Sequence, residues 1–195
     1  MSDDNVLPFP EPLPAEAEPL IPAIEALLFA AGEPVTAGAL ATALQVDDPL
    51  LVAVAARALA RRLRERGAGI LVVEVAGGFQ ARTHPRFAAE VLALRGGRPQ
   101  RLSRAALEVL SIIAYQQPAT RQDVEEVRGV ASGAVIKGLI ERGLLKVVGR
   151  EEIPGRPLQY GTTSGFLELF GLPDLKALPT LAEREALEED FDGGP

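Results

Sequence analysis

The order of segments between Leu102 and Thr163 constrains the fold more than any other feature of the chain. Three short helical patterns are followed by two strand patterns joined by a loop rich in Pro and Gly. Ser103 precedes the first apolar helical stripe as a candidate N-cap, and Pro118 ends that stripe because the residue before a proline avoids the α region. Thr120 then caps a second helix. Three helices followed by a hairpin form a winged helix, so we expect this domain here.

The later boundaries of this domain follow from the same local rules. The second helix should end at Gly129, and Ser132 should cap the third helix, which Gly143 closes. Alternating apolar residues on either side of Ile153–Pro157 predict two strands with that segment at the tip of the hairpin.

An earlier part of the chain repeats this pattern with an offset of 84 residues. The segment Glu33–Thr36 echoes Gln117–Thr120, since each is a helix end followed by a proline and a threonine cap. A tight hairpin over Ile70–Thr83 follows, and then a helix over residues 85–94 whose inward residues should be Phe87, Val91 and Leu94. A repeat of this length indicates a duplicated domain.

These patterns predict a mainly α fold with small β-hairpins, built from two tandem winged-helix domains with disordered acidic termini. The predicted divisions are a Pro-rich acidic tail over 1–19, a first domain over 20–95, a linker over 96–101, a second domain over 102–173 and an acidic tail over 174–195.

Charge and composition limit the compartment and the chemistry. The net charge is −7, but residues 1–19 hold five acids and no base, and residues 174–195 hold seven acids and two bases. The part between them carries fifteen acids and eighteen bases. The chain has no cysteine, which excludes disulfides and thiolate chemistry. The sequence shows neither an apolar run of about 18 residues nor a signal peptide, so we expect a cytoplasmic protein without a membrane segment.

The candidates for catalysis are few. His84, the only histidine, precedes Pro85 at a strand end, where a surface turn is expected. Glu125–Glu126 and Glu151–Glu152 are adjacent pairs whose carboxylates point in different directions. We therefore predict no catalytic residue, no metal site and no cofactor, and hence no enzyme.

Short motifs are spread over both predicted domains. In the second domain they are Leu102–Glu108, Ile113–Tyr115, Arg128–Val130, Leu139–Leu144, Pro154–Pro157 and Tyr160–Thr163. In the first domain they are Glu25–Ala30 and Val75–Phe79. Together, over about residues 20–172, they resemble the segregation and condensation protein B family. The resemblance implies a non-catalytic subunit of bacterial condensin that acts in chromosome condensation and partition during the cell cycle and cell division. It also implies a homodimer that binds the kleisin subunit (segregation and condensation protein A) and, through it, the chromosome-structuring ATPase.

The hairpin tip of the second domain has two compatible interpretations. Two prolines and a glycine make a rigid turn, and the same rigidity suits a preordered contact with a partner. Given the resemblance, we expect the kleisin to bind here, and the candidate residues are Arg150, Pro154, Gly155, Arg156, Pro157 and Tyr160.

A first helix is predicted to begin near Leu20 and to end at Gly32, and it looks too apolar for one buried face in a small domain. Its excess surface could pack on the linker or on a second copy, and the resemblance favours the copy. The candidate dimer residues are Leu20, Ile21, Ile24, Leu27 and Leu28.

A basic stripe of Arg57, Arg61 and Arg64 leaves a rival function open. It is either a solvated helix face or a surface for DNA phosphates. The alternative is therefore a winged-helix DNA-binding transcriptional regulator. In the second domain, the helix that would enter DNA offers only Lys137 and Arg142 beside Glu141, so we expect direct DNA contact to be weak if it occurs at all.

Overall fold

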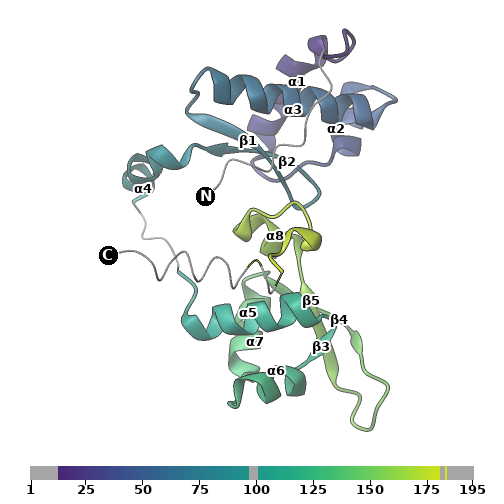
Figure 1. Cartoon of the computed structure of the whole chain (residues 1–195), viewed down its shortest axis with the longest axis vertical. Helices are drawn as coiled ribbons and strands as arrows, with labels where there is room; N and C mark the ends of the chain where they lie inside the picture. Colours follow the sequence, from purple (N-terminus) through teal and green to yellow (C-terminus); the bar gives the residue numbers. More distant parts are fainter. Residues whose placement is uncertain (1–12, 97–100, 181–182, 184–195) are drawn as a thin grey trace. The chain divides into compact units, whose positions relative to one another are not determined.

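The computed structural model describes residues 13–96, 101–180 and 183. The chain divides into two compact units, Met1–Gly97 and Arg98–Pro195, which are treated separately below as unit 1 and unit 2. Each unit is mainly helical with one small antiparallel sheet (Figure 1).

Unit 1 begins with a short 3-10 turn and continues through three helices, a hairpin and a fourth helix. Its elements are η1 (Glu18–Leu20), α1 (Ile21–Ala31), α2 (Ala37–Leu44), α3 (Pro49–Glu65), β1 (Ile70–Val75), β2 (Gly78–Thr83), η2 (Pro85–Phe87) and α4 (Ala88–Arg95).

Local signals explain the boundaries of these elements. The Thr36 side chain accepts a hydrogen bond from the amide of Ala39, which confirms it as the N-cap of α2. Asp48 caps α3 in the same way. Both residues of the turn between β1 and β2, Ala76 and Gly77, have positive φ angles, 51° and 75°. Two such residues give the turn whose twist matches that of the two strands.

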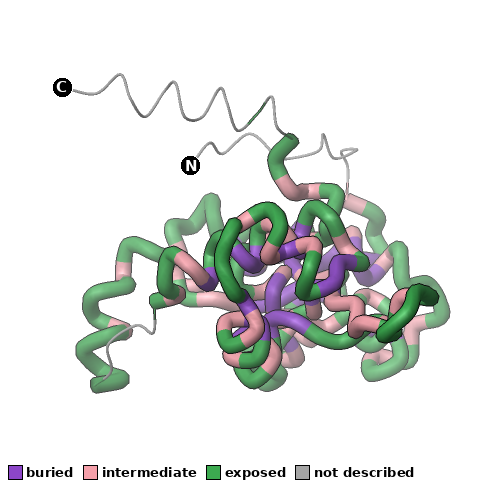
Figure 2. The backbone as a smooth tube through the Cα atoms, turned by 90° about the horizontal axis from the view of Figure 1, so that it is seen from below, coloured by how far each residue is buried: buried purple, intermediate pink, exposed green. Residues whose placement is uncertain are grey.

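The core of unit 1 lies where α1, α3 and the hairpin meet. In Figure 2 the buried residues of the whole described chain are purple. Most of its α3 residues are small: Ala55, Ala56 and Ala58 are buried. Because alanine side chains are short, α1 can lie close to α3 and place its own large side chains between the two helices.

Unit 2 repeats this order, again with a fourth helix after the hairpin. Its elements are α5 (Arg104–Gln116), β3 (Ala119–Thr120), α6 (Arg121–Arg128), α7 (Gly133–Glu141), β4 (Leu145–Arg150), β5 (Leu158–Thr162), α8 (Ser164–Phe170) and η3 (Leu175–Ala177). Its sheet has the order β3-β5-β4, so β5 is central.

The sequence repeat has a counterpart in the strand pairing. In unit 1, Val35 forms a bridge with Phe79. In unit 2, Ala119, which lies 84 residues after Val35 in the sequence, pairs with Tyr160. In both units a residue between the first and the second helix pairs with the second strand of the hairpin. In unit 2 this residue belongs to the two-residue strand β3, whereas in unit 1 it forms an isolated bridge. In unit 2 the predicted capping box is also confirmed, since Thr120 and Asp123 exchange side-chain to backbone hydrogen bonds.

Ordered structure extends into both predicted disordered tails. Ala17 is fully buried, and Arg62 donates two hydrogen bonds to Glu18, at 2.9 and 2.6 Å. At the other end, Leu178 packs against the core of unit 2, and the Tyr115 hydroxyl donates to the carbonyl of Pro179 at 2.6 Å. Proline content suggested disorder, but prolines also suit tight turns that pack on a core. The rest of both tails and residues 97–100 of the predicted linker lie outside the described residues.

Two further local predictions are wrong. The Ser132 side chain does not cap α7, because its hydroxyl is fully buried and interacts with Arg128 and Val130 instead. Leu94 does not point inward: it is 88% exposed, and α4 has no buried residue.

Candidate partner-binding site

The hairpin tip of unit 2 is a loop of seven residues, Glu151–Pro157, that projects away from the helices of the unit (Figure 1). The amide of Arg156 donates to the carbonyl of Ile153 at 2.9 Å and closes a turn. Gly155 and Arg156 both have positive φ angles, 89° and 41°. Since an arginine rarely adopts this conformation, the loop is held by its own contacts as well as by its prolines.

Arg150 forms the base of this loop. Its guanidinium donates to the carbonyl of Arg156 at 3.1 Å, and the amide of Glu151 donates to the carbonyl of Pro157 at 3.0 Å. The structure therefore brings Arg150 together with Pro154–Pro157, and the Arg156 side chain is left exposed at the tip.

Tyr160 stands apart from the other candidates. It lies on the central strand, paired with Ala119 and Val147, and its half-buried ring packs against the core of unit 2. We therefore assign Tyr160 a structural role at the base of the hairpin, and it does not join the exposed tip.

Three exposed apolar residues accompany the tip and were not predicted. Val147 and Val148 are each 47% exposed, and Ile153 is 46% exposed. A β-bulge between Val147 and Gly149 breaks the register, which is why two consecutive valines are both accessible. The adjacent valines in a strand next to Gly149 were the available sequence signal.

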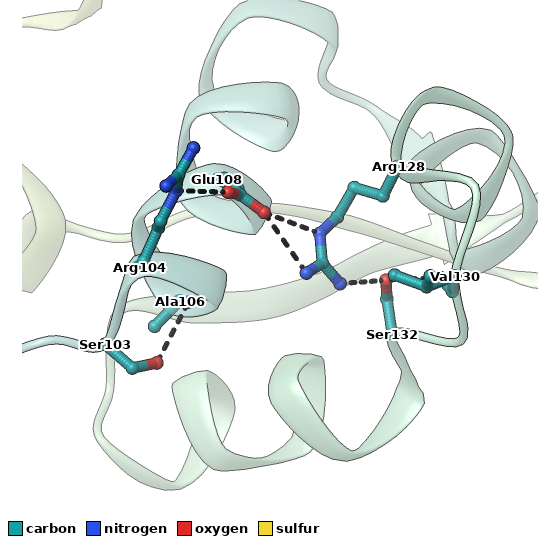
Figure 3. A network of polar contacts seen from close by, with 7 residues as sticks. All are labelled: Ser103, Arg104, Ala106, Glu108, Arg128, Val130 and Ser132. Carbon is teal, nitrogen blue, oxygen red and sulfur yellow. Dashed lines mark hydrogen bonds and ion pairs between the residues drawn. The ribbon is translucent and has the colours of Figure 1, made fainter.

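A network of polar side chains connects helices α5, α6 and α7 of unit 2, the unit to which this hairpin belongs (Figure 3). The Arg128 guanidinium donates to Glu108 on α5, at 3.3 and 3.2 Å, and to the Ser132 hydroxyl at 2.7 Å. The Arg128 side chain is only 10% exposed. Arg104, which is 95% exposed, contacts the other oxygen of Glu108 at 3.2 Å. One guanidinium thus joins α5 to the turn between α6 and α7.

Glu125 extends this network. Its carboxylate accepts a hydrogen bond from the amide of Ser132 at 2.7 Å and another from Arg121 at 2.6 Å. The hydrogen bond from the Ser132 amide, followed by that from Arg121, holds the pKa of the Glu125 carboxyl below its usual value. The α6–α7 turn is therefore held by a charged carboxylate.

The candidate dimer residues on and before α1 are mostly used within unit 1. Ile21, Ile24 and Leu28 are 4%, 0% and 0% exposed and belong to its core, and Leu20 and Leu27 pack beside them half-buried. Ile21, Ile24 and Leu28 are thus part of the core of unit 1, and the dimer interface at the five candidate residues stays a prediction.

Three arginines of α3 form ion pairs with acidic side chains. Arg57 pairs with Glu74 and lies over the ring of Phe79, and Arg61 pairs with Glu65 at 3.8 Å. Outside the predicted stripe, Arg62 pairs with Glu18 and Arg66 with Glu25. Arg64, the third residue of the stripe, is exposed. These pairs reduce the positive field that DNA phosphates would require.

His84, the only histidine, lies directly after the end of β2 and makes a local backbone contact. His84 accepts a hydrogen bond from the amide of Arg86 at 3.2 Å and caps a 3-10 turn. Within residues 13–96, 101–180 and 183, no three His, Cys, Asp or Glu side chains are grouped to hold a metal ion. In the same residues no single helix could span a membrane, although α2 and α3, bent by 102°, pass the length and composition test as a pair.

Known proteins are similar to this chain along most of its length. The family described as segregation and condensation complex subunit ScpB matches residues 22–181. The chain belongs to the segregation and condensation protein B family. The family relative from Syntrophotalea carbinolica is 50% identical over 178 residues, which cover 88% of this chain and 90% of that protein. The relative from Bacillus subtilis is 42% identical, with 87% of each chain covered.

Solved structures of family members are also similar to this chain. ScpB from Mycobacterium tuberculosis is 40% identical with a TM-score of 0.37, covering 80% of this chain and 97% of that one. A second crystal structure, described as a dimer of the ScpB N-terminal domain complexed with ScpA peptide, is 30% identical with a TM-score of 0.38. It covers 41% of this chain and 99% of that one.

Proposed function

We propose that this protein is a non-catalytic accessory subunit of the bacterial condensin formed by the chromosome-structuring ATPase and its kleisin, and that it acts in chromosome condensation and segregation in the cytoplasm, on the nucleoid. The family match over residues 22–181 carries this proposal. Agreement with a relative along 88% of the chain supports a role for both units.

We interpret each unit as a winged-helix domain. In both, three helices precede an antiparallel hairpin, and a residue between the first and the second helix pairs with the second strand of that hairpin. The hairpin of each unit is then its wing. The wing of unit 1 turns in two residues, whereas that of unit 2 carries the seven-residue tip.

The long wing of unit 2 is our proposed contact for the kleisin. Its tip is exposed, is closed by the hydrogen bond from the Arg156 amide to the carbonyl of Ile153, and carries both a cation, Arg156, and an apolar side chain, Ile153. The apolar side chains of Val147 and Val148 are exposed on β4, the strand that leads to the tip. A preordered surface loses little entropy on binding, and arginine and apolar anchors commonly dominate protein interfaces.

We also propose that the protein forms a homodimer. The related N-terminal domain was crystallised as a dimer with an ScpA peptide, which names the same two partners for that protein.

The test is chromatography with light scattering of the full chain, alone and mixed with the kleisin of the same organism. We expect a dimer mass and a heavier complex. I153A combined with R156A should weaken the complex at least tenfold, because hot-spot side chains are each worth more than about 1 kcal/mol. The matched control is K137A, which removes a cation from α7, where the Lys137 side chain is 79% exposed. The proposal would be refuted if K137A lost as much binding as the double variant, or if the wild-type chain did not bind the kleisin.

The rival function of a DNA-binding regulator has less support. Paired arginines on α3 and the apolar character of α7 both oppose it. Tight duplex binding that persists at physiological salt and is abolished by R64E would favour it instead.

A further inference from the structure

Helix α4 is apolar yet uncovered. Six of its eight residues are apolar, none is buried, and Leu94 is 88% exposed. Its main contact within unit 1 is with the short turn η2 that precedes it, and in Figure 1 it lies apart from α1–α3. A helix shorter than about 12 residues is only marginally stable by itself in water. The helix therefore needs a cover that unit 1 does not supply.

The spacing of the apolar side chains of α4 indicates which kind of element could pack against it. Phe87, Val91 and Leu94 follow the alternating four- and three-residue spacing of a coiled-coil seam, with Val91 at an a position and Leu94 at a d position. Phe87, at the inner end, already lies against Arg86 and beside Gly69. The seam is thus covered at its inner end and open at its outer end.

The positions of the two charged residues of α4 indicate that a second copy of α4 could be the partner helix. Glu90 and Arg95 flank the seam at its g and e positions, five residues apart. In a parallel pair of helices, a g residue of one helix meets the e residue that follows five places later in the other. A second copy of α4 would therefore match Glu90 with Arg95 of the partner on both sides of the seam, and within the described part of the chain neither residue forms an ion pair.

We propose that α4 pairs with α4 of a second copy as a short parallel coiled coil. Valine at a and leucine at d favour two-stranded parallel pairing, which agrees with this choice of occupant. The inference rests on the proposed homodimer and assigns its contact to Val91 and Leu94. Eight residues bury too little surface to form the whole interface, so α4 fixes its register and direction.

The test uses the absence of cysteine from the chain, so that one introduced thiol is unique. In a parallel pair Leu94 faces itself, and L94C should form a disulfide-linked dimer on mild oxidation of the full chain. The matched control is A89C, because Ala89 is also exposed but lies on the opposite side of the helix. Cross-linking of A89C as readily as L94C would overturn the proposal.

Charge reversal supplies a second, independent measurement. E90R and R95E should each weaken the dimer about fivefold, and an equimolar mixture of the two variants should restore it as a heterodimer. A dimer by light scattering without L94C cross-links or charge rescue would overturn the α4 pairing and leave the homodimer standing. A monomeric chain would refute both.

Discussion

The strongest stability prediction concerns Arg128, because its guanidinium joins three elements of unit 2. Its side chain is only 10% exposed, and it donates to Glu108 and to the fully buried Ser132. In R128A the Glu108 carboxylate, 44% exposed, stays hydrated, so breaking the ion pair costs little by itself. The Ser132 hydroxyl loses a charge-assisted donor in the interior, which is worth about 1.5–3 kcal/mol.

We therefore expect R128A to destabilise unit 2 by about 2 kcal/mol, measured as a shift of its urea unfolding transition at an unchanged m-value. The control is R104A, which removes a cation from the same carboxylate. Because the Arg104 side chain is 95% exposed, its loss should stay within about 0.5 kcal/mol. If the two variants unfold at the same urea concentration, the Arg128 network does not stabilise the α6–α7 turn, and the reasoning fails.

Three further predictions concern the stability of variants at Gly78, Leu28 and Glu125. G78A should lower the free energy of unfolding by about 2 kcal/mol or more, because a Cβ at Gly78 would lie 2.6 Å from the carbonyl oxygen of Val35. G138A is the control: a Cβ at Gly138 meets open space within a helix, so this variant should raise the free energy of unfolding by up to about 1 kcal/mol. Thermal melts of the two variants measure the difference. L28A should cost about 2–5 kcal/mol in urea unfolding, since Leu28 is fully buried, and a cost below about 1 kcal/mol would contradict the assigned core. Because the pKa of Glu125 is lowered in the folded protein, its ionised carboxylate stabilises the fold above its ordinary pKa of 4.5, and this stabilisation is lost as the pH falls through the pKa of the folded state. The difference in melting temperature between wild type and E125Q should therefore shrink from pH 6 to pH 3.

Local signals made the boundaries of helices and strands predictable from the sequence. Thr36 and Thr120 cap the helices that follow them, because a side-chain oxygen reaches amides only two or three residues away. Ser132 satisfies the same rule in sequence but not in the structure. Arg128 takes its hydroxyl, and which residue a buried hydroxyl meets depends on how α5, α6 and α7 pack.

The candidate sites were less predictable, because burial depends on neighbours that are distant in sequence. Ile24 looked like surplus apolar surface on α1, but the alanines of α3 leave room to bury it. Tyr160 looked like an anchor for a partner, but its pairing with Ala119 holds its ring against the core. The exposed tip at Arg156 was predictable, since prolines and a glycine confine a loop wherever it lies.

The different lengths of the two hairpins have a consequence for valency. The repeated units share their helices and their strand pairing, but one hairpin turns through Ala76 and Gly77 while the other carries the loop Glu151–Pro157. A partner that binds the long loop finds no equivalent loop on the short hairpin. Each chain therefore has one such binding site despite its internal repeat. A homodimer would then offer two, and a partner with two matching segments would bind the second at the high effective concentration set by the first.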